Sequence, residues 1–412
     1  MWKVKLKHKL SISQWGWIWD ANGTATVTCD RSHKEFDICT MNGPTLLDQS
    51  SSTLFALGPH TWNQSNISMK IQPYPLKNDK SAMSSVKEIT LTSTPPKSTC
   101  GATHHSPALV FSVGGYTGNF YHDINENFIS LFITINSLFP NQDVTLVVTD
   151  GTIWWFQKYA ELLSAFSPHH LIINANNLTT NHCFPSATIG LIKHGAITID
   201  PKLLPYPRTL HDFSAFLKNT YTKSDTPSLY SNKRGKPHLT LVARKGSVSR
   251  VILNQEEVIN VAKEIGFNVH VLEPSRNVSI ANAYRLIHSS HVMLGVHGAG
   301  LTHFLFLRPG SVVVQVVPIG LEWAAKTYYA DPPKVLGLEY IEYKIEANES
   351  SLLEEYGANS LVIKDPKAFH HGEWAKRRVY LKKQNVKLDI IRFKKCLVKA
   401  YEKANIFMNK VN

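Results

Sequence analysis

The chain has 412 residues, of which 43% are hydrophobic, so it is long enough for a large globular protein with two separate cores. This composition excludes a disordered protein, and no run of about 20 apolar residues predicts a membrane-spanning helix. The net charge of +13 favours anionic partners, but neither a zinc-finger spacing nor an RNA-binding motif supports a nucleic-acid-binding protein.

The first hundred residues, 1–100, carry short β-like runs between polar loops and predict an irregular N-terminal stem region. Strands and helices then alternate, with strands expected at 108–113, 143–149 and 171–173 and helices at 119–139 and 154–164. Such alternation indicates a parallel sheet with crossover helices. We therefore expect a Rossmann-like N-terminal domain over residues 101–230.

A second series follows the polar linker at 224–237. Its strands are expected at 239–242, 268–272, 292–296 and 312–317, and its helices at 254–265, 279–289 and 301–306. This order predicts a doubly wound, Rossmann-like C-terminal domain over residues 236–370.

The last segment, 371–412, is basic and predicts a terminal helix. Apolar residues recur on one helical face, at Ile390, Phe393, Leu397 and Tyr401. Such a helix could pack back across the domain junction. The Lys and Arg residues here favour a solvated helix face, and a nucleic-acid contact through this segment is the alternative.

The stretch MLGVHGAGLTH joins a predicted buried strand to a helix. Glycines in such a turn let the backbone approach a ligand, and the start of the helix offers free N–H groups to an anion. A tight packing turn is the alternative, since GVHGAG matches neither G-x-G-x-x-G nor a P-loop. The candidate diphosphate-binding residues are His297, Gly298, Ala299, Gly300 and Leu301.

Basic residues follow the first strand of the second series, in LVARKGSVSR. Arg244, Lys245 and Arg250 should lie at the same sheet edge as the glycine turn, because parallel strands end together. Arg binds phosphate through two parallel hydrogen bonds, so these residues are candidates to neutralise a departing diphosphate. An ordinary basic loop is the alternative.

The segment YTGNFYHDINEN predicts a helix start that carries His122, Asp123 and Glu126. His122 and Glu126 are i,i+4 neighbours on one face, and Asp123 is adjacent in sequence. A histidine beside carboxylates is a candidate general base, and helix capping is the alternative. The sequence has no D-x-D, H-E-x-x-H or C-x-x-C, so we expect neither a metal site nor a cofactor.

Sequons and cysteines indicate the compartment. Cys29 and Cys39 lie close together in a turn-rich stretch and are candidates for a local disulfide. With five cysteines, at least one is unpaired or bonds another chain. Six N-x-S/T sequons favour a glycoprotein of the secretory pathway, at Asn22, Asn63, Asn66, Asn177, Asn277 and Asn348.

Taken together, these pieces resemble glycosyltransferase family 61, a plant group that includes xylan arabinosyl- and xylosyltransferases. The resemblance covers about residues 25–365 and is carried by the Cys29 and Cys39 pair, GGYTGNFYHD, ARKGSVSR, VHGAGLTH, PGSVVVQVVP and LEYIEYKIEANESSL. It implies a GT-B fold, in which two Rossmann-like, doubly wound domains face each other across a cleft and the second holds the sugar nucleotide. It also implies a Golgi-lumen enzyme with an N-terminal membrane anchor, for which this sequence shows no segment.

The resemblance further implies a metal-independent, inverting transfer of xylose or arabinofuranose from a UDP-sugar to a xylan-type cell-wall polysaccharide. His122 or Asp123 is expected to take the proton from the acceptor hydroxyl. Glu349 is a candidate donor-sugar contact on the resemblance alone. The family often has Asp at the position of Glu126 and Asn at that of His303. Aromatic residues that could stack on acceptor sugars, or belong to the core, are Tyr116, Tyr121, Trp154 and Trp155.

Two alternatives to this function remain. One is a transferase that acts on protein-linked N- or O-glycans. The other is a non-catalytic glycan-binding module of the same fold, because a fold alone does not establish chemistry.

Overall fold

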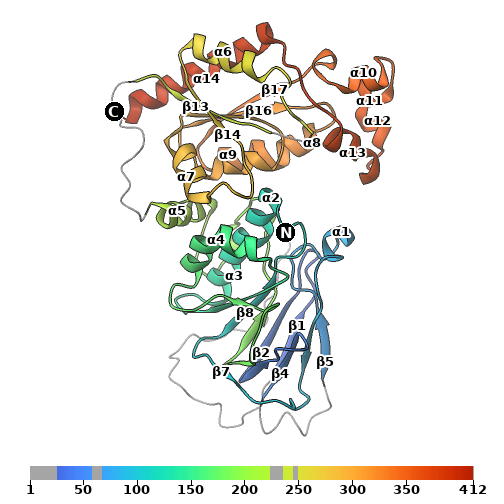
Figure 1. Ribbon diagram of the computed structural model, residues 1–412, viewed down its shortest axis with the longest axis vertical. Coiled ribbons are helices and arrows are strands. Elements are labelled where there is room, and N and C mark those ends of the chain that lie inside the picture. Colours follow the sequence, from blue (N-terminus) through green and yellow to red (C-terminus); the bar gives the residue numbers. More distant parts are fainter. Residues whose placement is uncertain (1–25, 58–66, 223–234, 245–248, 412) are drawn as a thin grey trace.

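The computed structural model describes residues 26–57, 67–222, 235–244 and 249–411. It is a mixed α/β structure, as predicted, and its N-terminal half lies below its C-terminal half in Figure 1. Most of the predicted linker, including the expected boundary at residue 230, lies outside the described residues. No helix in these ranges is both long enough and apolar enough to cross a membrane.

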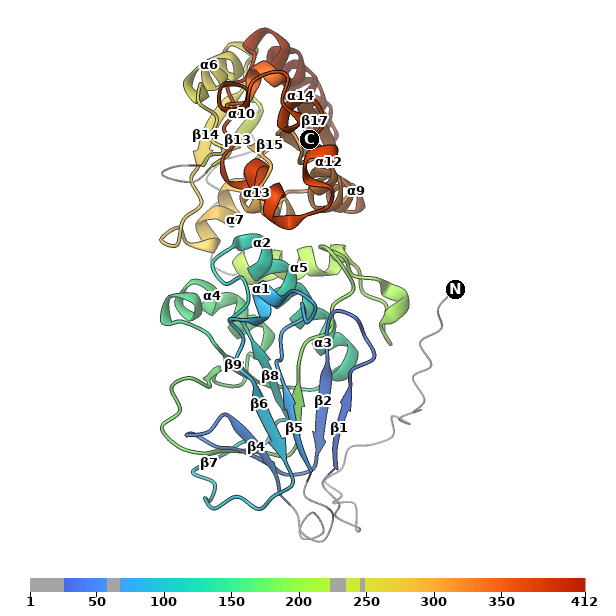
Figure 2. The same ribbon diagram turned by 90° about the vertical axis from the view of Figure 1, so that its right-hand side faces the viewer.

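The N-terminal half contains two six-stranded sheets. The first has the order β1 (Thr26–Asp30), β2 (Ile38–Asn42), β12 (Ala187–Ile189), β8 (Ala108–Ser112), β9 (Thr145–Thr149) and β10 (Ile173–Asn174). The second has the order β5 (Ser68–Ile71), β6 (Ile89–Thr92), β4 (Thr53–Ala56), β3 (Thr45–Leu47), β11 (His182–Phe184) and β7 (Ala102–Thr103). One apolar cluster takes residues from both sheets, among them Met41, Val110 and Leu54, so the sheets pack face to face (Figure 2).

The first hundred residues differ from the irregular stem that the sequence suggests. Of these, residues 26–92 supply strands β1 to β6, which are integral to both sheets. The strands have only three to five residues, and several pair with partners far along the chain, such as β2 with β12 and β3 with β11. Short strands with distant partners leave little periodicity to read in the sequence.

Helices cover the other face of the first sheet. Along β8, Leu109 and Phe111 face the helical layer, while Ala108 and Val110 face the second sheet, as the two-residue period of a strand requires. The helices of this half are α1 (Lys80–Met83), α2 (Phe120–His122), the π-helix η2 (Asp123–Ile129), α3 (Ser130–Leu138), α4 (Ile153–Phe166), the 3-10 helix η3 (Pro201–Leu203) and α5 (Leu210–Tyr221).

The C-terminal half contains one parallel sheet of the doubly wound type. Its order is β14 (Asn268–Leu272), β13 (His238–Val242), β15 (Val292–Val296), β16 (Val312–Val317) and β17 (Glu339–Lys344). The strand order reverses between β13 and β15, and in such sheets ligands bind at the carboxyl ends of the strands beside this reversal. The LVARKGSVSR and GVHGAG stretches follow these two strands.

Helices surround this sheet (Figures 1 and 2). They are α6 (Gln255–Ile265), α7 (Ile280–Ser289), the 3-10 helix η4 (Ala299–Phe306), α8 (Glu322–Ala325), the π-helix η5 (Lys326–Ala330), α9 (Asp331–Val335), the 3-10 helix η6 (Ala347–Glu349), α10 (Leu352–Tyr356), α11 (Leu361–Lys364), α12 (Pro366–His370), α13 (Trp374–Lys382) and α14 (Ile390–Val411). Ser279, one of two predicted caps of α7, accepts the N–H of Asn282.

The terminal helix α14 forms as expected but packs against the C-terminal half itself. Phe393 and Leu397 are buried with the sheet residues Val312 and Ile341 in one cluster. Ile391 and Ile406 point to solvent instead.

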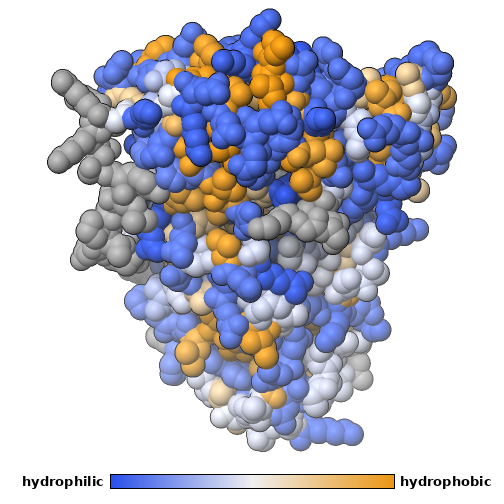
Figure 3. Space-filling model, turned by 45° about the horizontal axis from the view of Figure 1, so that its top comes forward, coloured by the Kyte–Doolittle hydropathy of each residue, from blue (hydrophilic) through white to orange (hydrophobic). Residues whose placement is uncertain are grey.

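On the face that Figure 3 shows, hydrophobic residues form separate patches among hydrophilic ones, which is normal for a protein surface.

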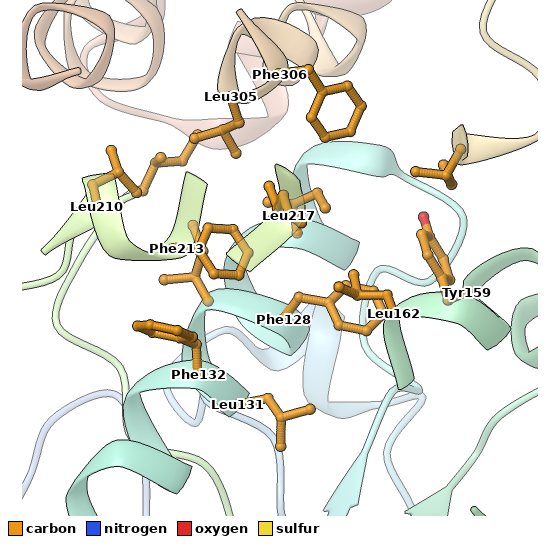
Figure 4. Packing of buried hydrophobic residues seen from close by; sticks show 14 of the residues in the cluster. Phe128, Leu131, Phe132, Tyr159, Leu162, Leu210, Phe213, Leu217, Leu305 and Phe306 are labelled. Carbon is orange, nitrogen blue, oxygen red and sulfur yellow. The ribbon is translucent and has the colours of Figure 1, made fainter. Parts of the chain in front are cut away.

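A shared core joins the two halves. Phe213 and Leu217 of α5 pack with Phe128 from η2 on one side and with Leu305 and Phe306 from η4 on the other (Figure 4). The Ser214 hydroxyl also donates to the carbonyl of Leu305 at 3.1 Å. The ends of β8 and β15, which carry the candidate site, are therefore held at one packed junction.

Two disulfides lie in the N-terminal half. Cys29 and Cys39 are directly opposite each other on β1 and β2 and are bonded, as the sequence suggests. Cys100 is bonded to Cys183, a pairing that the sequence did not indicate. Cys396 on α14 is a free thiol.

Candidate active site

The histidine–carboxylate pair forms on the helix that follows β8. The Asn119 side chain caps this helix by accepting the N–H of Tyr121 at 3.1 Å. One turn later, Nδ1 of His122 donates to Oε2 of Glu126 at 2.9 Å. The His122 side chain is 24% exposed, whereas that of Glu126 is 2% exposed. Because Glu126 occupies Nδ1, the other ring nitrogen, Nε2, is the one that can accept a proton.

Two further groups hold Glu126 in its charged form. Lys193 places Nζ 3.1 Å from Oε1, and the Asn125 amide donates to the same oxygen at 2.7 Å. Burial alone would raise the pKa of Glu126, but the hydrogen bond and charge of His122, with the charge of Lys193, bring that pKa below its usual value. Lys193 is buried and also lies 3.6 Å from Glu35. Sequence reasoning missed Lys193, since it comes from the loop after β12, far from the YTGNFYHDINEN segment.

Asp123 points away from His122 into the helical layer. Its carboxylate accepts hydrogen bonds from the Trp155 indole at 3.1 Å, the Tyr159 hydroxyl at 3.1 Å and the Gly118 N–H at 3.2 Å. Burial raises the pKa of Asp123 to about 6, although these hydrogen bonds oppose the shift. The side chain is fully engaged and buried, so His122 is better placed than Asp123 to meet a substrate.

Arg244 and Arg250 come together at the strand-order reversal. Nε of Arg244 donates to the carbonyl of Ser249 at 2.7 Å, and Nη1 of Arg250 donates to the carbonyl of His297 at 2.8 Å. Arg250 is only 9% exposed, and its Nε is buried without a hydrogen-bond partner. Among the described residues, neither guanidinium forms an ion pair with a carboxylate. Burial, followed by the charge of Arg244, lowers the pKa of Arg250 to about 10.

A buried guanidinium beside a second, half-buried one is costly without a counter-ion, and an anion bound between them would offset this cost. The backbone of Arg250 adopts a φ of 63°, which residues other than Gly, Asn and Asp rarely adopt. Local strain of this kind is often found at functional sites. The predicted third cation, Lys245, lies outside the described residues.

The glycine turn brings its backbone against the two arginines. A Cβ atom on Gly298 would lie 2.6 Å from Nη1 of Arg244 and 3.1 Å from Nη1 of Arg250, and the φ of 154° at Gly298 is one that residues with a side chain rarely adopt, so glycine is favoured here. Helix η4 begins at Ala299, and the N–H groups at such a start have no acceptor within the helix. The N–H of Leu301 is already donated to the carbonyl of Gly298, at 2.9 Å. Ala299 and Gly300 are therefore the better backbone donors for an anion.

His297 is buried behind this turn. The Gln315 amide donates to Nδ1 of His297 at 2.9 Å, and Tyr340 in turn donates to the Gln315 carbonyl oxygen at 2.8 Å. Burial, with the charges of Arg250 and Arg244, lowers the pKa of His297 to about 3, so the ring is neutral and carries its proton on Nε2. His297 contacts the arginine pair through its backbone carbonyl, which accepts a hydrogen bond from Arg250.

Aromatic contacts connect the two sets of candidates. Ring centroids lie 5.2 Å apart for His122 and Tyr121, 6.2 Å for Tyr121 and Tyr329, and 5.2 Å for Tyr329 and His297. Phe120 also stacks on His303, with centroids 4.1 Å apart. Tyr329 belongs to the π-helix η5, and π-helical turns are frequent at functional sites. Tyr121 and Tyr329 thus lie between the His122–Glu126 pair, called the dyad below, and the turn that carries the arginine pair. Sequence reasoning did not include this aromatic connection.

Glu349 has partners other than a sugar. Its carboxylate, 2% exposed, accepts hydrogen bonds from the Tyr343 hydroxyl at 2.5 Å and the Asp389 N–H at 2.7 Å, and it pairs with Arg392. These contacts tie the start of α14 to η6. The neighbouring Asn348 is exposed, so its sequon is compatible with a buried Glu349.

The structure describes only some of the other sequons. Asn177 and Asn277 are exposed, whereas Asn22, Asn63 and Asn66 lie outside the described residues. Over the ranges that the structure describes, no three His, Cys, Asp or Glu side chains gather as metal ligands would. Whether the chain uses a metal or a cofactor stays a prediction.

Comparisons with known proteins give the chain its relatives. The family described as "Glycosyltransferase 61" matches residues 120–314. The chain is 37% identical over 399 residues to the xylan glycosyltransferase MUCI21 of Arabidopsis thaliana. This alignment covers 92% of this chain and 80% of that protein. It is 34% identical over 381 residues to the α-1,3-arabinosyltransferase XAT2 of rice (Oryza sativa subsp. japonica), over 92% of this chain and 64% of that protein. A rice β-1,2-xylosyltransferase, XAX1, is 34% identical over 400 residues, 93% of this chain and 69% of that protein.

Proposed function

The chain belongs to glycosyltransferase family 61, and from this membership we propose that it transfers xylose or arabinofuranose from a UDP-sugar to a xylan-type polysaccharide. The names of its relatives support this choice, since one acts on xylan and the others transfer arabinose or xylose. We further propose that the two halves are the domains of a GT-B enzyme, with the donor on the C-terminal half and the acceptor approaching from the N-terminal half.

The observation that carries the proposal is the unpaired arginine couple at the strand-order reversal. Arg250 is buried and Arg244 half-buried, neither has a carboxylate partner among the described residues, and a glycine turn lies against both. A nucleoside diphosphate supplies the missing negative charge in a form that Arg binds with two hydrogen bonds. Positive charge fixed at this position also stabilises the diphosphate as its charge develops in the transition state.

The proposed reaction is one displacement at the anomeric carbon of the donor sugar. Nε2 of His122 accepts the proton of an acceptor hydroxyl, whose oxygen forms a bond to that carbon. The bond between the anomeric carbon and the diphosphate oxygen breaks at the same time, and its electron pair leaves with UDP. Arg244 and Arg250 offset the added charge, so this mechanism needs no metal ion. Attack from the face opposite to the leaving group inverts the anomeric configuration.

We place the enzyme in the Golgi lumen. Disulfides persist in oxidising compartments, so the Cys29–Cys39 and Cys100–Cys183 bonds support a location in the secretory pathway. The exposed sequons at Asn177, Asn277 and Asn348 are compatible with glycosylation there. Glycosidase treatment followed by gel electrophoresis tests this. A smaller mobility shift in an Asn177→Gln variant than in the wild type would identify Asn177 as a modified site.

A donor and acceptor panel tests the activity. The protein is incubated with UDP-xylose, UDP-arabinofuranose, UDP-glucose or UDP-N-acetylglucosamine, and with xylohexaose or a glycopeptide. Release of UDP is measured, and the product linkage is read by NMR. We expect pentose transfer to xylohexaose, with inversion and at an undiminished rate in EDTA. Transfer only to the glycopeptide would support the protein-glycan alternative, and xylohexaose binding without turnover would support the binding module. A rate that EDTA abolishes and Mn²⁺ restores would contradict metal independence.

A further inference from the structure

Two tryptophans are exposed on the C-terminal half. Trp323 on α8 is 36% exposed and Trp374 at the start of α13 is 57% exposed. Among the residues that the structure describes, the other tryptophans, Trp154 and Trp155, are half-buried and buried. Exposed indole rings in close proximity usually mark a binding surface, because leaving them in water costs free energy.

Arg377 shows that both tryptophans belong to one surface. It lies one helical turn after Trp374, so the two side chains are neighbours on α13. Its guanidinium carbon lies 4.7 Å from the centroid of the Trp323 ring, on one face of that ring. This contact fixes the plane of Trp323, and a pre-ordered ring loses little conformational entropy when a ligand binds.

Aromatic contacts continue from Trp323 through the half-buried Tyr328 and the buried Tyr121 to the candidate base. Ring centroids lie 6.1 Å apart for Trp323 and Tyr328, 5.1 Å for Tyr328 and Tyr121, and 5.2 Å for Tyr121 and His122. In both ribbon views α13 stands opposite α1 and α2, across the junction of the two halves (Figures 1 and 2). A row of aromatic rings therefore leads from exposed indoles to the dyad.

Tyr116 extends this row on the N-terminal half. Its ring centroid lies 4.4 Å from that of His122, and its hydroxyl donates to the Asp79 carboxylate at 2.9 Å. Tyr116 is half-buried, and the bond to Asp79 fixes the orientation of its ring. The dyad is thus bordered by ordered aromatic rings from both halves.

We propose that Trp374, Trp323 and Tyr328 form a binding track for the acceptor, an uncharged chain of pyranose rings, which leads one of its hydroxyls to His122. The track rests on the function proposed above. A pyranose ring has an apolar C–H face that packs on an aromatic ring, while its hydroxyls remain in water at the rim. Successive rings along the track would let successive sugars contribute, so a long acceptor binds better than a short one.

Acidic side chains lie beside both tryptophans of the track and argue for a neutral chain. Lys376 pairs with Glu373 at 2.8 Å, beside Trp374, and the guanidinium of Arg377 lies on Trp323. Glu322, next to Trp323, is exposed. Helix α13 itself carries Lys376, Arg377, Arg378 and Lys382, but an exposed acid directly precedes each indole in sequence, Glu373 before Trp374 and Glu322 before Trp323. These two carboxylates would repel a polyanion at the rings themselves.

Calorimetric titration of the whole chain without donor tests the track. Xylobiose and xylohexaose are titrated into the wild type and into the Trp374→Ala, Trp323→Ala and Trp374→Phe variants. Ile391→Ala is the control, since Ile391 is 81% exposed on α14, outside the track. We expect each Trp→Ala change to weaken xylohexaose binding by about tenfold, with little effect on xylobiose, because tryptophan is among the residues that contribute most where they contact a partner. Trp374→Phe should retain most of the affinity, and Ile391→Ala all of it.

Kinetics separates the track from the proposed function. In the transfer assay, the Trp→Ala variants should raise KM for xylohexaose by a similar factor and leave KM for the UDP-sugar unchanged. Unchanged xylohexaose binding and KM in both Trp→Ala variants would overturn the track while leaving the transferase intact. Weakened binding in these variants, with no transfer by the wild type from any UDP-sugar, would overturn the proposed function and retain the track. Preferential, salt-sensitive binding of an acidic oligogalacturonide that needs both tryptophans would overturn the assignment of a neutral chain.

Discussion

Nδ1 of His122 lies 2.9 Å from Oε2 of Glu126, and this bond determines which ring nitrogen is available for chemistry. Glu126 is buried and ionised, and Lys193 stabilises its charge. An ionised carboxylate only accepts hydrogen bonds, so Nδ1 is the protonated nitrogen, and in the neutral imidazole the lone pair is on Nε2. The arrangement suits a general base that takes a proton from a neutral hydroxyl.

Replacement of His122 tests its role as the base. We expect His122→Ala to lower kcat by about 10²- to 10⁴-fold, which is the usual contribution of a positioned base. Glu126→Gln should lower kcat in the same direction by a smaller factor, since it keeps the shape but not the charge. The measurement is kcat with saturating donor and acceptor. His211→Ala is the matched control, because His211 is exposed on α5. A kcat for His122→Ala within threefold of the control value would rule out His122 as the base.

Asp123 offers a second test, since it is the competing candidate. Asp123→Asn should lower kcat by less than tenfold, because the carboxylate points toward Trp155 and Tyr159 and not toward the dyad. A loss as large as that of His122→Ala would move the role of base to Asp123.

The same variant should change the pH dependence of stability. The folded protein raises the pKa of Asp123 from 3.8 to about 6, so folding favours the protonated form. This contribution is present below pH 3.8 and is lost as the pH rises through 6, a loss of about 3 kcal/mol at about 1.36 kcal/mol per pKa unit. The free energy of unfolding, measured by urea denaturation from pH 4 to 7, should therefore fall less in Asp123→Asn than in the wild type. Parallel curves for the two proteins would contradict the raised pKa.

Strands β13, β15 and β16 of the C-terminal half could be predicted from the sequence because they are buried over almost their whole length. Strand β17, whose residues largely alternate between exposed and buried, was not expected. The run VMLGV in β15 is apolar throughout, VVVQVV in β16 is apolar except for Gln315, and short glycine-containing turns end both runs. Their parallel order also places Arg244 and Gly298 at one edge without knowledge of the packing. The short strands of residues 26–92 were visible in the sequence only as β-like runs, and their place in two sheets could not be predicted, because it depends on pairing with distant strands such as β11 and β12.

Elsewhere in the site, contacts were predictable where residues are neighbours in sequence. His122 and Glu126 are one helical turn apart, so their contact follows from helix geometry. Lys193 and Tyr329 reach the same site from a loop and a π-helix far along the chain, and nothing local marks them. Glu349 shows the opposite case, since a buried carboxylate is as easily a structural anchor as a sugar contact.

Removal of Arg250 tests the diphosphate site by binding as well as by turnover. The wild type should gain thermal stability in UDP, by about 2.7 kcal/mol when UDP is at 100 times its Kd. Arg250→Ala should lose most of this gain and should lower kcat/KM by about 10²- to 10³-fold, as expected for a donor that stabilises developing charge. Arg208→Ala, on an exposed arginine that pairs with Asp212, should behave as the wild type does. An undiminished UDP-dependent rise in Tm for Arg250→Ala would contradict the diphosphate site.

Glu349 distinguishes a structural anchor from a donor-sugar contact. Glu349→Gln removes the charge that pairs with Arg392 and leaves this guanidinium without its closest partner. Breaking a buried pair from one side costs about 3–5 kcal/mol, and the 32% exposure of Arg392 should bring the loss to the lower end of that range or below it. We therefore expect a lower Tm, with KM for the UDP-sugar within about twofold of the wild-type value at a temperature where both proteins are folded. Glu354→Gln, on an exposed residue of α10, is the control for stability. An unchanged Tm combined with a large rise in KM for the UDP-sugar would show instead that Glu349 meets the donor, because its contacts with Tyr343 and Asp389 would then have to open in the bound state.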